Sequence, residues 1–510
     1  MNVIRQPNKE VKFLLGRNLY FVKNKYRWNK YCVMKDMVDC KLIFNHMTRA
    51  MVSMSYAEFD NIFNNVESEQ YEFLFENYFI VEESYNEMEE IDKVRAHLSI
   101  PIDDRYLDEV YQFLILPTTG CNARCFYCYE RKMSKSVMTE ETAEKVVQYI
   151  CKKAKNKDRH ITLRWFGGEP LFNMKVIRHI TSRLTELGYK FTSTMISNGY
   201  LFSEEVVKEA AEQWKLNNVQ ITLDGTEEVY NKAKNYIYKN QDEVSPYKKV
   251  VDNIGYLTDK KISVTIRMNT DMYNAENLKE LVREIHDRFP DNRHISMYAW
   301  PIFEDEDNVR TDEDRKNVYE KIREIEDVLE ECGYGKGRGL EEKIRAHHCM
   351  VDGAYNVTIS PNGELGLCEH YVDSDFWGHI DDDSAEKRDW SIIHSWREYV
   401  EPNETCKECP RYPSCIRVKK CLDLKDCSIY HRDFQLRHEE QAMVNMYQQW
   451  VDNEKRKRNN KNIKNNGGRC SNGQCNTNKS SMPLEAVKPV VKENTPIKTF
   501  INKFKDLFKK

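Results

Sequence analysis

Six short apolar or alternating segments recur through the middle of the chain, and a stretch with helical spacing follows each of the first five. The strand-like segments are residues 113–116, 161–166, 192–196, 219–223, 262–268 and 294–299. The helix-like stretches lie near residues 140–153, 175–187, 204–214, 249–258 and 278–289. Strands that alternate with helices predict a parallel sheet with helices outside it. We therefore expect an α/β domain over residues 105–340.

The first 104 residues have a different pattern. Short strands are predicted at residues 19–22, 32–34 and 42–44, and Ser55 with Glu58 has the spacing of a capping box that opens a helix. Helical stretches at 69–77 and 86–98 flank an apolar run at 79–81. These elements predict a winged-helix-like domain. Acidic and basic residues are mixed and no basic recognition helix is visible, so nucleic-acid binding is the weaker interpretation and a structural cap on the α/β domain is another.

The last region, which we place at 436–510, is expected to begin with a helix, and the composition changes again within it. From Asp452 onward the chain contains 15 Lys and Arg but 5 Asp and Glu, whereas the whole chain has a net charge of −4. This predicts a solvated, disordered tail, in which Cys470 and Cys475 are weak candidates for redox-active or metal-exposed thiols. Residues 496–510 form a basic amphipathic pattern suited to an anionic membrane surface or a partner protein.

Length and cysteine content narrow the class of protein. A chain of 510 residues predicts roughly three domains. It has no N-terminal apolar signal region and no apolar run of about 20 residues, so we expect a cytoplasmic protein. Sixteen cysteines in an intracellular chain favour metal ligation over disulfides.

Three cysteines, Cys121, Cys125 and Cys128, follow the first predicted strand of the α/β domain. They offer three thiolates to one metal centre and no fourth. Iron–sulfur cubanes take four cysteine ligands, so a three-cysteine loop would leave one iron open. By themselves, three cysteines in a loop are also compatible with buried small hydrophobic residues or with part of a zinc site.

Two further motifs stand at the ends of the next two predicted strands. Gly167-Gly168-Glu169-Pro170 follows residues 161–166, and Ser197-Asn198-Gly199 follows residues 192–196. Glycines allow a backbone to approach a ligand closely. In parallel barrels the chemistry lies at the carboxyl ends of the strands, so three motifs in this order favour a functional site over ordinary turns.

With these motifs the chain resembles the radical S-adenosylmethionine (radical SAM) enzymes. The resemblance implies a partial (β/α)6 barrel and a 4Fe-4S cluster on the three cysteines, whose open iron chelates the methionine end of SAM. Lys234 stands where related maturases often carry an arginine that faces the SAM carboxylate, and Arg267 is a second cation, although it could equally pair with a barrel carboxylate. The other implied SAM-binding residues are Tyr127, Gly167, Gly168, Glu169, Pro170, Ser197 and Asn198.

Seven more cysteines follow the barrel: Cys349, Cys368, Cys406, Cys409, Cys415, Cys421 and Cys427. A turn at Gly363 predicts a hairpin that delivers Cys368. CxxC pairs with further cysteines usually indicate zinc. After a radical SAM barrel, however, region 341–435 resembles the SPASM domain, which holds two auxiliary 4Fe-4S clusters.

The SPASM resemblance assigns the cysteines by position. It gives Cys406, Cys409, Cys415 and Cys427 to the second auxiliary cluster and Cys349, Cys368 and Cys421 to the first. The gap from Cys415 to Cys421 is longer than is common in the family, and a further cysteine near Cys349 is absent. The first auxiliary cluster would then have an iron that is open to a substrate thiolate or capped by His347, His348 or Cys332.

These features together predict a radical SAM maturase that generates a 5'-deoxyadenosyl radical and modifies a ribosomally made, cysteine-rich precursor peptide, with a thioether crosslink favoured. The N-terminal domain would bind the leader of the peptide, and flavodoxin or ferredoxin would supply electrons. One alternative is a sulfatase-maturing enzyme that makes formylglycine; such enzymes carry an aspartate where this chain has Glu369, which could serve as the base. The other is a non-enzymatic iron–sulfur electron-transfer or metal-binding protein.

Overall fold

A computed structural model describes residues 1–16, 25–64, 68–99, 102, 107–237, 245–290, 293–304, 309–334, 339–342, 344, 349–353, 355–370, 374–396, 402–415, 420 and 427–466. Met1–Val451 form one compact unit and Asp452–Lys510 form a second. None of the described helices is long and apolar enough to cross a membrane.

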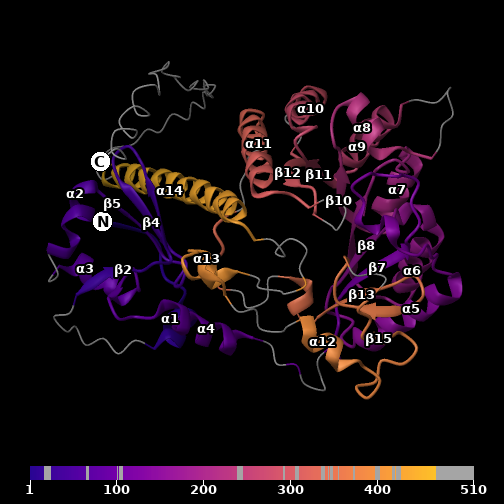
Figure 1. Ribbon diagram of the computed structural model, residues 1–510, viewed down its shortest axis with the longest axis horizontal. Coiled ribbons are helices and arrows are strands. Elements are labelled where there is room, and N and C mark those ends of the chain that lie inside the picture. Colours follow the sequence, from indigo (N-terminus) through magenta and orange to yellow (C-terminus); the bar gives the residue numbers. More distant parts are fainter. Residues whose placement is uncertain are drawn as a thin grey trace, which may run out of the picture. The chain divides into compact units, whose positions relative to one another are not determined.

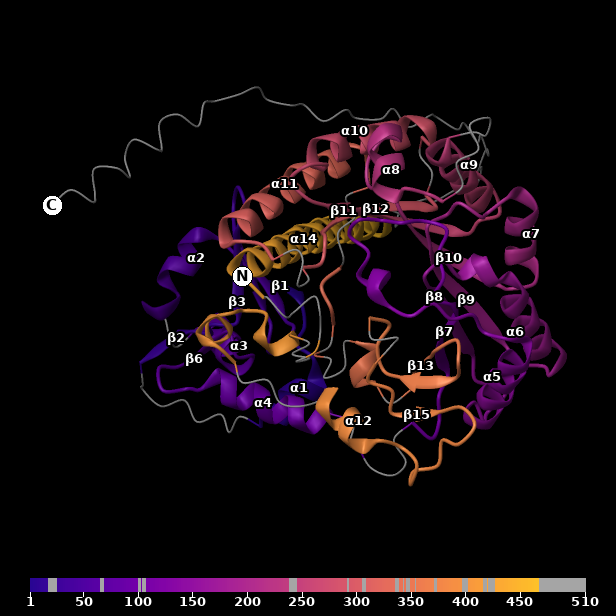
Figure 2. The ribbon, with the colours of Figure 1, turned by 45° about the vertical axis from the view of Figure 1, so that its right-hand side comes forward.

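The first unit is built on a nine-stranded sheet with the order β12-β11-β10-β9-β8-β7-β13-β14-β15. Its six consecutive strands from β7 to β12 are all parallel, as the sequence predicts. They are β7 (Gln112–Thr118), β8 (Ile161–Gly167), β9 (Phe191–Ser197), β10 (Leu216–Thr222), β11 (Ser263–Thr270) and β12 (Ile295–Pro301). The strands curve into an arc with helices along its outer side (Figure 2).

Seven helices accompany these strands (Figure 1). They are α5 (Glu140–Lys153), α6 (Met174–Glu186), α7 (Glu204–Glu212), α8 (Glu227–Lys234), α9 (Pro246–Asp259), α10 (Ala275–Arg288) and α11 (Asp312–Glu331). Side chains of Thr139 and Ser203 cap the first turns of α5 and α7. The sequence predicts α5, α6, α7, α9 and α10, but α8 and α11 are additional.

The two faces of this sheet differ in chemistry. Alternate strand residues such as Leu163, Trp165, Val219 and Ile221 point to the outer side and are fully buried with apolar helix residues in the main core. The residues between them point to the opposite side, which we call the inner face. Its central members are Gln112, Thr162, Arg164, Thr194, Asn218, Gln220, Thr265, Arg267 and Tyr298, and they are half-buried or exposed. The polar inner face is therefore the side of the sheet available to a ligand.

The C-terminal region extends the same sheet. β13 (Asn356–Ile359) pairs in parallel with β7, and β14 (Glu364–Gly366) and β15 (Gly378–His379) follow antiparallel. β13 and β14 form the hairpin predicted at Gly363, whose φ of +95° favours glycine. Short helices α12 (Trp390–Trp396) and α13 (Glu404–Lys407) come next. The pairing with β7 is not visible in the sequence, and it brings Cys368 to the barrel.

The N-terminal residues form two small antiparallel sheets, β1-β5-β4-β3 and β2-β6, with four helices. The capping box at Ser55 and Glu58 is formed as predicted, whereas predicted strand 19–22 lies outside the described residues. The elements are β1 (Asn2–Arg5), α1 (Lys9–Leu15), β2 (Tyr26–Trp28), β3 (Cys32–Asp36), β4 (Lys41–Asn45), β5 (Met51–Met54), α2 (Tyr56–Asn61), α3 (Glu69–Glu76), β6 (Ile80–Glu82) and α4 (Glu87–Leu98).

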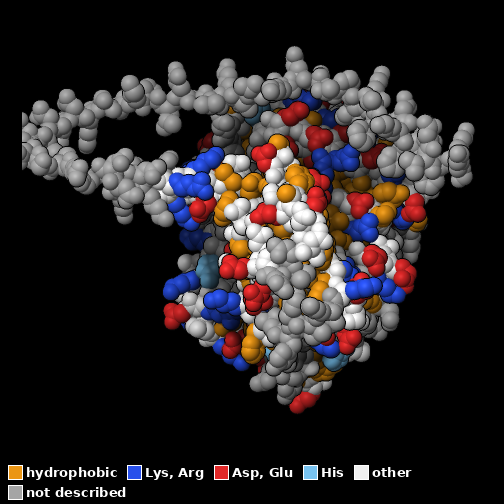
Figure 3. All heavy atoms as spheres, turned by 90° about the vertical axis from the view of Figure 1, so that its left-hand side faces the viewer, with side chains coloured by type: hydrophobic (Ala, Val, Ile, Leu, Met, Phe, Trp, Pro, Cys, Tyr) orange, Lys and Arg blue, Asp and Glu red, His pale blue; other side chains and the backbone are white. Residues whose placement is uncertain are grey.

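The face that carries α2, α3 and β2 has a mixed surface. Acidic, basic and hydrophobic side chains are interspersed over it (Figure 3). Proteins that bind nucleic acid instead gather Lys and Arg on one face or along one helix.

Helix α14 (Ile429–Asn466) corrects one prediction. The basic composition after Asp452 predicts a disordered tail, but residues 452–466 are helical. Lys, Arg, Glu and Asn in this stretch are compatible with helix, so polarity alone was a poor guide there. Residues 467–510, with Cys470, Cys475 and the predicted amphipathic helix at 496–510, lie outside the described part of the chain.

Candidate functional site

The three sequence motifs meet at the carboxyl ends of β7, β8 and β9. The Gly-Gly-Glu-Pro turn packs directly against the start of the cysteine loop: the backbone N–H of Gly168 donates to Thr118 O at 3.2 Å, and that of Glu169 donates to Gly120 O at 2.9 Å. Asn198 reaches the same loop, since its amide donates to Asn122 Oδ1 at 2.7 Å. The motifs therefore build one site.

Two glycines make this close approach possible. Gly167 has a φ of +124°, and a Cβ on it would lie 2.2 Å from Thr118 O. A Cβ on Gly168 would lie 2.3 Å from Gly120 O and 2.6 Å from Thr119 O. These neighbours are backbone atoms that cannot rotate away, so both positions require glycine.

We expect Gly168→Ala to destabilise the protein by about 1–3 kcal/mol or more, because the new methyl group overpacks the turn against the cysteine loop. Iron retention by that loop should fall with stability. Gly255→Ala in α9 is the matched control: its nearest neighbour would be the Phe289 ring at 3.5 Å, and alanine favours a helix by about 1 kcal/mol. Thermal unfolding and iron analysis of both variants check this, and equal behaviour of the two would contradict it.

Glu169 is completely buried at the centre of the site. Its carboxylate accepts hydrogen bonds from Ser197 Oγ at 2.9 Å and from the backbone N–H groups of Asn198 and Leu171 at 2.8 and 3.1 Å. Burial nevertheless raises the pKa of Glu169 to about 7. A cationic ligand would compensate this carboxylate, which suits the ammonium group of SAM.

The cysteine thiols lie close enough to influence one another. Burial, followed by the charge of Glu169 and the neighbouring Cys125 and Cys128, raises the pKa of Cys121 to about 12. Burial, Glu130 and Cys125 raise that of Cys128 to about 11. A metal centre deprotonates such thiols and compensates their charge, so this donor set fits an iron–sulfur cluster. Within the described residues, no three Cys, His, Asp or Glu side chains close around a single metal ion, and a cubane instead gives each cysteine its own iron.

Tyr127, the aromatic residue of the loop, belongs to a buried charge network. Its hydroxyl donates to Asp224 Oδ2 at 2.5 Å and accepts from Lys234 Nζ at 2.6 Å. The Lys234 ammonium lies 2.9 Å from Asp224 Oδ2 and donates to Thr222 Oγ1 at 2.6 Å. Burial alone would lower the pKa of Lys234, but the Asp224 carboxylate raises it above its usual value.

This network bears on the predicted contact between Lys234 and the SAM carboxylate. An ammonium has three N–H donors, and all three face Asp224, Tyr127 and Thr222. Arg267 is less committed: Nε donates to Asn269 Oδ1 at 2.9 Å, and the guanidinium lies over the Phe303 ring at 5.1 Å. The SAM contact of either cation stays a prediction.

Cys368 and Glu369 lie near the cysteine loop. Burial and then Glu130 raise the pKa of Tyr129, and Glu369, Cys128 and Cys368 raise it further, so all of them lie near its hydroxyl. The Glu369 carboxylate lies 3.6 Å from Arg164 on the inner face, and its side chain is 16% exposed. A group in this position can act on a ligand at the inner face, although its role as a base stays a prediction.

The structure also brings together the four cysteines assigned to the second auxiliary cluster. After burial, Cys415, Cys406 and Cys409 raise the pKa of Cys427 to about 11. Burial, followed by Cys415, also raises the pKa of Cys409. Four cysteines gathered in this way fit an iron–sulfur centre, as the barrel loop does. Cys349 is half-buried beside the main core, while Cys421, His347 and His348 lie outside the described residues. The charged neighbours of Cys332 are Arg283, Glu331 and Asp287.

The N-terminal elements hold the loop between Cys406 and Cys415. Tyr412 donates to Asp92 Oδ2 at 2.8 Å and stacks on Tyr31. Arg95 donates to Pro413 O at 2.9 Å, and Arg49 donates to Ser414 Oγ at 2.9 Å. The first hundred residues therefore share an interface with the second cysteine group.

Sequence reasoning missed Arg164, Asn122 and the pairing partner of Lys234. Arg164 lies in an alternating strand pattern, which indicates that it faces away from the apolar core. No local signal indicates that Asp224 binds Lys234, since the two residues are ten positions apart and meet only in the folded chain.

Comparisons with known proteins place this site in context. Residues 115–287 match the Radical SAM superfamily. The radical SAM cyclopropyl synthase TigE of Paramaledivibacter caminithermalis is 24% identical over 51% of this chain and 64% of its own length. The uncharacterized protein MJ0907 of Methanocaldococcus jannaschii is 27% identical over 24% of this chain and 41% of its own length. The chain thus spans less than two thirds of each curated relative.

Among solved structures, native anSMEcpe with bound AdoMet and the Cp18Cys peptide is similar in fold. It superposes with a TM-score of 0.51 and 19% identity, over 67% of this chain and 99% of anSMEcpe. At this identity the likeness concerns the α/β fold with its parallel sheet.

Proposed function

We propose that the chain, whose residues 115–287 match the Radical SAM superfamily, is an enzyme that modifies a ribosomally made peptide. The observation that carries the proposal is the meeting of the cysteine loop, the Gly-Gly-Glu-Pro turn and Ser197-Asn198 in one hydrogen-bonded site. The match to this superfamily supports an enzyme over a non-enzymatic iron–sulfur protein.

In this proposal Cys121, Cys125 and Cys128 hold a 4Fe-4S cluster. When bound, the cluster and SAM supply a 5'-deoxyadenosyl radical that abstracts hydrogen. The chain's own residues bind and orient SAM: Glu169 receives its ammonium group, Ser197 and Asn198 fix the Glu169 carboxylate, and Tyr127 forms part of the wall. Gly167 and Gly168 keep the turn close to the cysteine loop.

The C-terminal cysteines form auxiliary sites in the same proposal. Cys406, Cys409, Cys415 and Cys427 hold one auxiliary 4Fe-4S cluster, supported by the proximity through which the other three raise the pKa of Cys427. Cys349, Cys368 and Cys421 hold another. Residues 1–104 bind the leader of the precursor peptide, supported by their contacts with the loop at 406–415.

We assign the product as a thioether in a cysteine-rich peptide and the electron donor as a small carrier such as flavodoxin or ferredoxin. Bond formation between sulfur and carbon removes two hydrogen atoms from the peptide. The solved anSMEcpe structure, which contains AdoMet and a peptide, supports a peptide substrate for this fold.

A second candidate is formylglycine formation of the sulfatase-maturase type. Glu369 favours it, because a carboxylate directly after Cys368 lies near the site and could take a proton. The pairing of Glu369 with Arg164 favours a charge-balancing role instead, so we rank this candidate second.

The deciding experiment incubates the anaerobically reconstituted, reduced protein with SAM, with and without a cysteine-bearing peptide encoded beside its gene. Peptide-stimulated release of 5'-deoxyadenosine is the expected result. Loss of two hydrogens together with loss of an alkylatable thiol, both persisting after treatment with a thiol reductant that opens disulfides, identifies a thioether. The same mass change with an intact thiol indicates a carbon–carbon bond. Absence of 5'-deoxyadenosine from the fully iron-loaded protein would refute the proposal.

The pKa of Glu169 predicts how SAM binding depends on pH. Burial raises this pKa to about 7, so the carboxylate that receives the ammonium group is mostly protonated at pH 6 and mostly ionised at pH 8. We expect SAM affinity to fall about tenfold from pH 8 to pH 6. Calorimetry of SAM binding to the unreduced protein across this range measures it. Glu169→Gln should bind weakly at every pH, and a flat wild-type profile would contradict the assignment.

A further inference from the structure

The strands of the barrel sheet contribute charge of one sign to its inner face. Among the described strands β7 to β12, the charged residues are two arginines, Arg164 on β8 and Arg267 on β11. Strand register places both on the inner face, since Arg164 pairs with Thr194 and Arg267 with Thr222 and Tyr298. Their neighbours on the strands are mostly neutral polar side chains, so the strands themselves contribute positive charge and no negative charge to this face.

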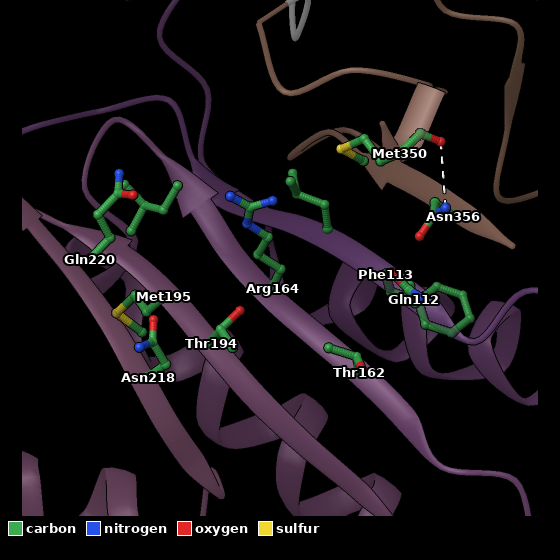
Figure 4. A pocket seen from close by; sticks show the side chains of 12 residues that line it. Gln112, Phe113, Thr162, Arg164, Thr194, Met195, Asn218, Gln220, Met350 and Asn356 are labelled. Atoms are coloured by element: carbon green, nitrogen blue, oxygen red, sulfur yellow. Dashed lines mark hydrogen bonds between the residues drawn. The ribbon is translucent and has the colours of Figure 1, made fainter. Parts of the chain in front are cut away.

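A cavity of about 340 Å³ lies over this face, between β7 to β10 and the C-terminal residues Met350 and Asn356. Arg164 is the charged member of its lining. In Figure 4 its side chain rises from β8 into the space between Gln220 and Met350. The remaining lining residues are Gln112, Phe113, Leu114, Thr162, Thr194, Met195, Ile196 and Asn218.

Arg164 has a long ion pair and a partly exposed side chain, although it lines a cavity. Its Nη2 lies 3.6 Å from Glu369 Oε1, beyond hydrogen-bond distance, and its side chain is 42% exposed. Arg178 offers a contrast, because it donates twice to Glu209, at 2.6 and 2.8 Å. A guanidinium has five N–H donors in a planar fork that matches a carboxylate. The part of the chain that the structure describes gives Arg164 no such bidentate partner.

We propose that Arg164 anchors a carboxylate of the substrate, so that the peptide segment entering the inner face is acidic at this point. The carboxylate belongs to an Asp or Glu side chain or to the C-terminus of the peptide. This inference rests on the proposed function and specifies its substrate class. Glu369 is the counter-ion of Arg164 until the substrate carboxylate displaces it, and it then becomes available beside Cys368.

The test measures binding rather than turnover. Three probes are titrated into reconstituted, SAM-loaded, unreduced protein and followed by saturation-transfer NMR: acetyl-Gly-Gly-Glu-Gly-Gly-amide, its Gln counterpart, and acetyl-pentaglycine with a free C-terminus. We expect a carboxylate probe to bind more tightly than the Gln probe. Arg164→Gln should weaken that probe about 10- to 100-fold and leave the Gln probe unchanged.

Two further variants complete the design. Arg178→Gln, on the outer helix α6, should change nothing. Glu369→Gln should tighten binding of the carboxylate probe, because it removes the competing counter-ion. If Arg164→Gln fails to bind SAM, the effect of Glu369→Gln on probe affinity decides whether Arg164 binds a carboxylate. Preference for the Glu peptide assigns a side chain, and preference for the free C-terminus assigns the terminal carboxylate.

The proposal is overturned if no probe binds, if all bind alike, or if the preference survives Arg164→Gln. Release of 5'-deoxyadenosine by the same preparation after reduction is measured separately. Failure of carboxylate binding is therefore distinguishable from failure of the radical function.

Discussion

Replacement of Cys125 by alanine is expected to lower the rate of 5'-deoxyadenosine formation by more than about a thousandfold, because a loop with two thiols cannot hold the cluster that cleaves SAM. The variant should also lose about four iron atoms per chain and retain about eight if both auxiliary clusters form. Iron and sulfide analysis with product quantification measures both effects.

The matched control is Cys151→Ala. Cys151 lies in helix α5, where it packs beside the main core, and it is not one of the predicted cluster ligands. The Cys151→Ala variant should keep the iron content of the wild type and its rate of 5'-deoxyadenosine formation. SAM cleavage by Cys125→Ala at the wild-type rate would overturn the assignment of the loop, and loss of all iron would show instead that the auxiliary sites depend on it.

The second large effect concerns the buried pair Lys234–Asp224, whose members are 2% and 1% exposed. Lys234→Met leaves the Asp224 carboxylate buried without its cation, and we expect a loss of about 3–5 kcal/mol of unfolding free energy. Adding Asp224→Asn removes the orphaned charge and should recover most of that loss. Anaerobic denaturant unfolding, followed by tryptophan fluorescence, measures the unfolding free energies of the wild type, the single variant and the double variant.

Lys232→Met on the same helix is the control, because Lys232 is exposed and should shift stability by no more than about 0.5 kcal/mol. SAM affinity is measured beside stability. If Lys234 serves the SAM carboxylate rather than Asp224, Lys234→Met would weaken SAM binding and leave the unfolding free energy near that of the wild type.

The barrel was largely predictable because its signals are local. Each of the six strands alternates or is continuously apolar, and α5 is bounded by a Thr139 cap and a change of pattern after Lys153. The motif residues Gly168, Glu169 and Ser197 were recognisable by their order at strand ends. Their convergence followed from parallel strands ending at one edge.

Long-range pairings were not predictable from one sequence. Nothing local to Asn356–Ile359 indicates that it pairs with β7, because register depends on the partner strand. The Arg164–Glu369 pair and the Lys234–Asp224 pair likewise join separate elements. Helix α8 was not predicted because it spans only two turns, and the part of α14 after Asp452 was not predicted because its polar composition resembles that of a tail.

The pairing of β13 with β7 has a consequence for biosynthesis. β7 carries the cysteine loop at its end, yet one of its two neighbours is made about 240 residues later. Until the ribosome has released that neighbour, the nascent barrel has an unsatisfied strand edge, which is an aggregation hazard. The cysteine loop is therefore already synthesised during the interval in which the edge of β7 is still open.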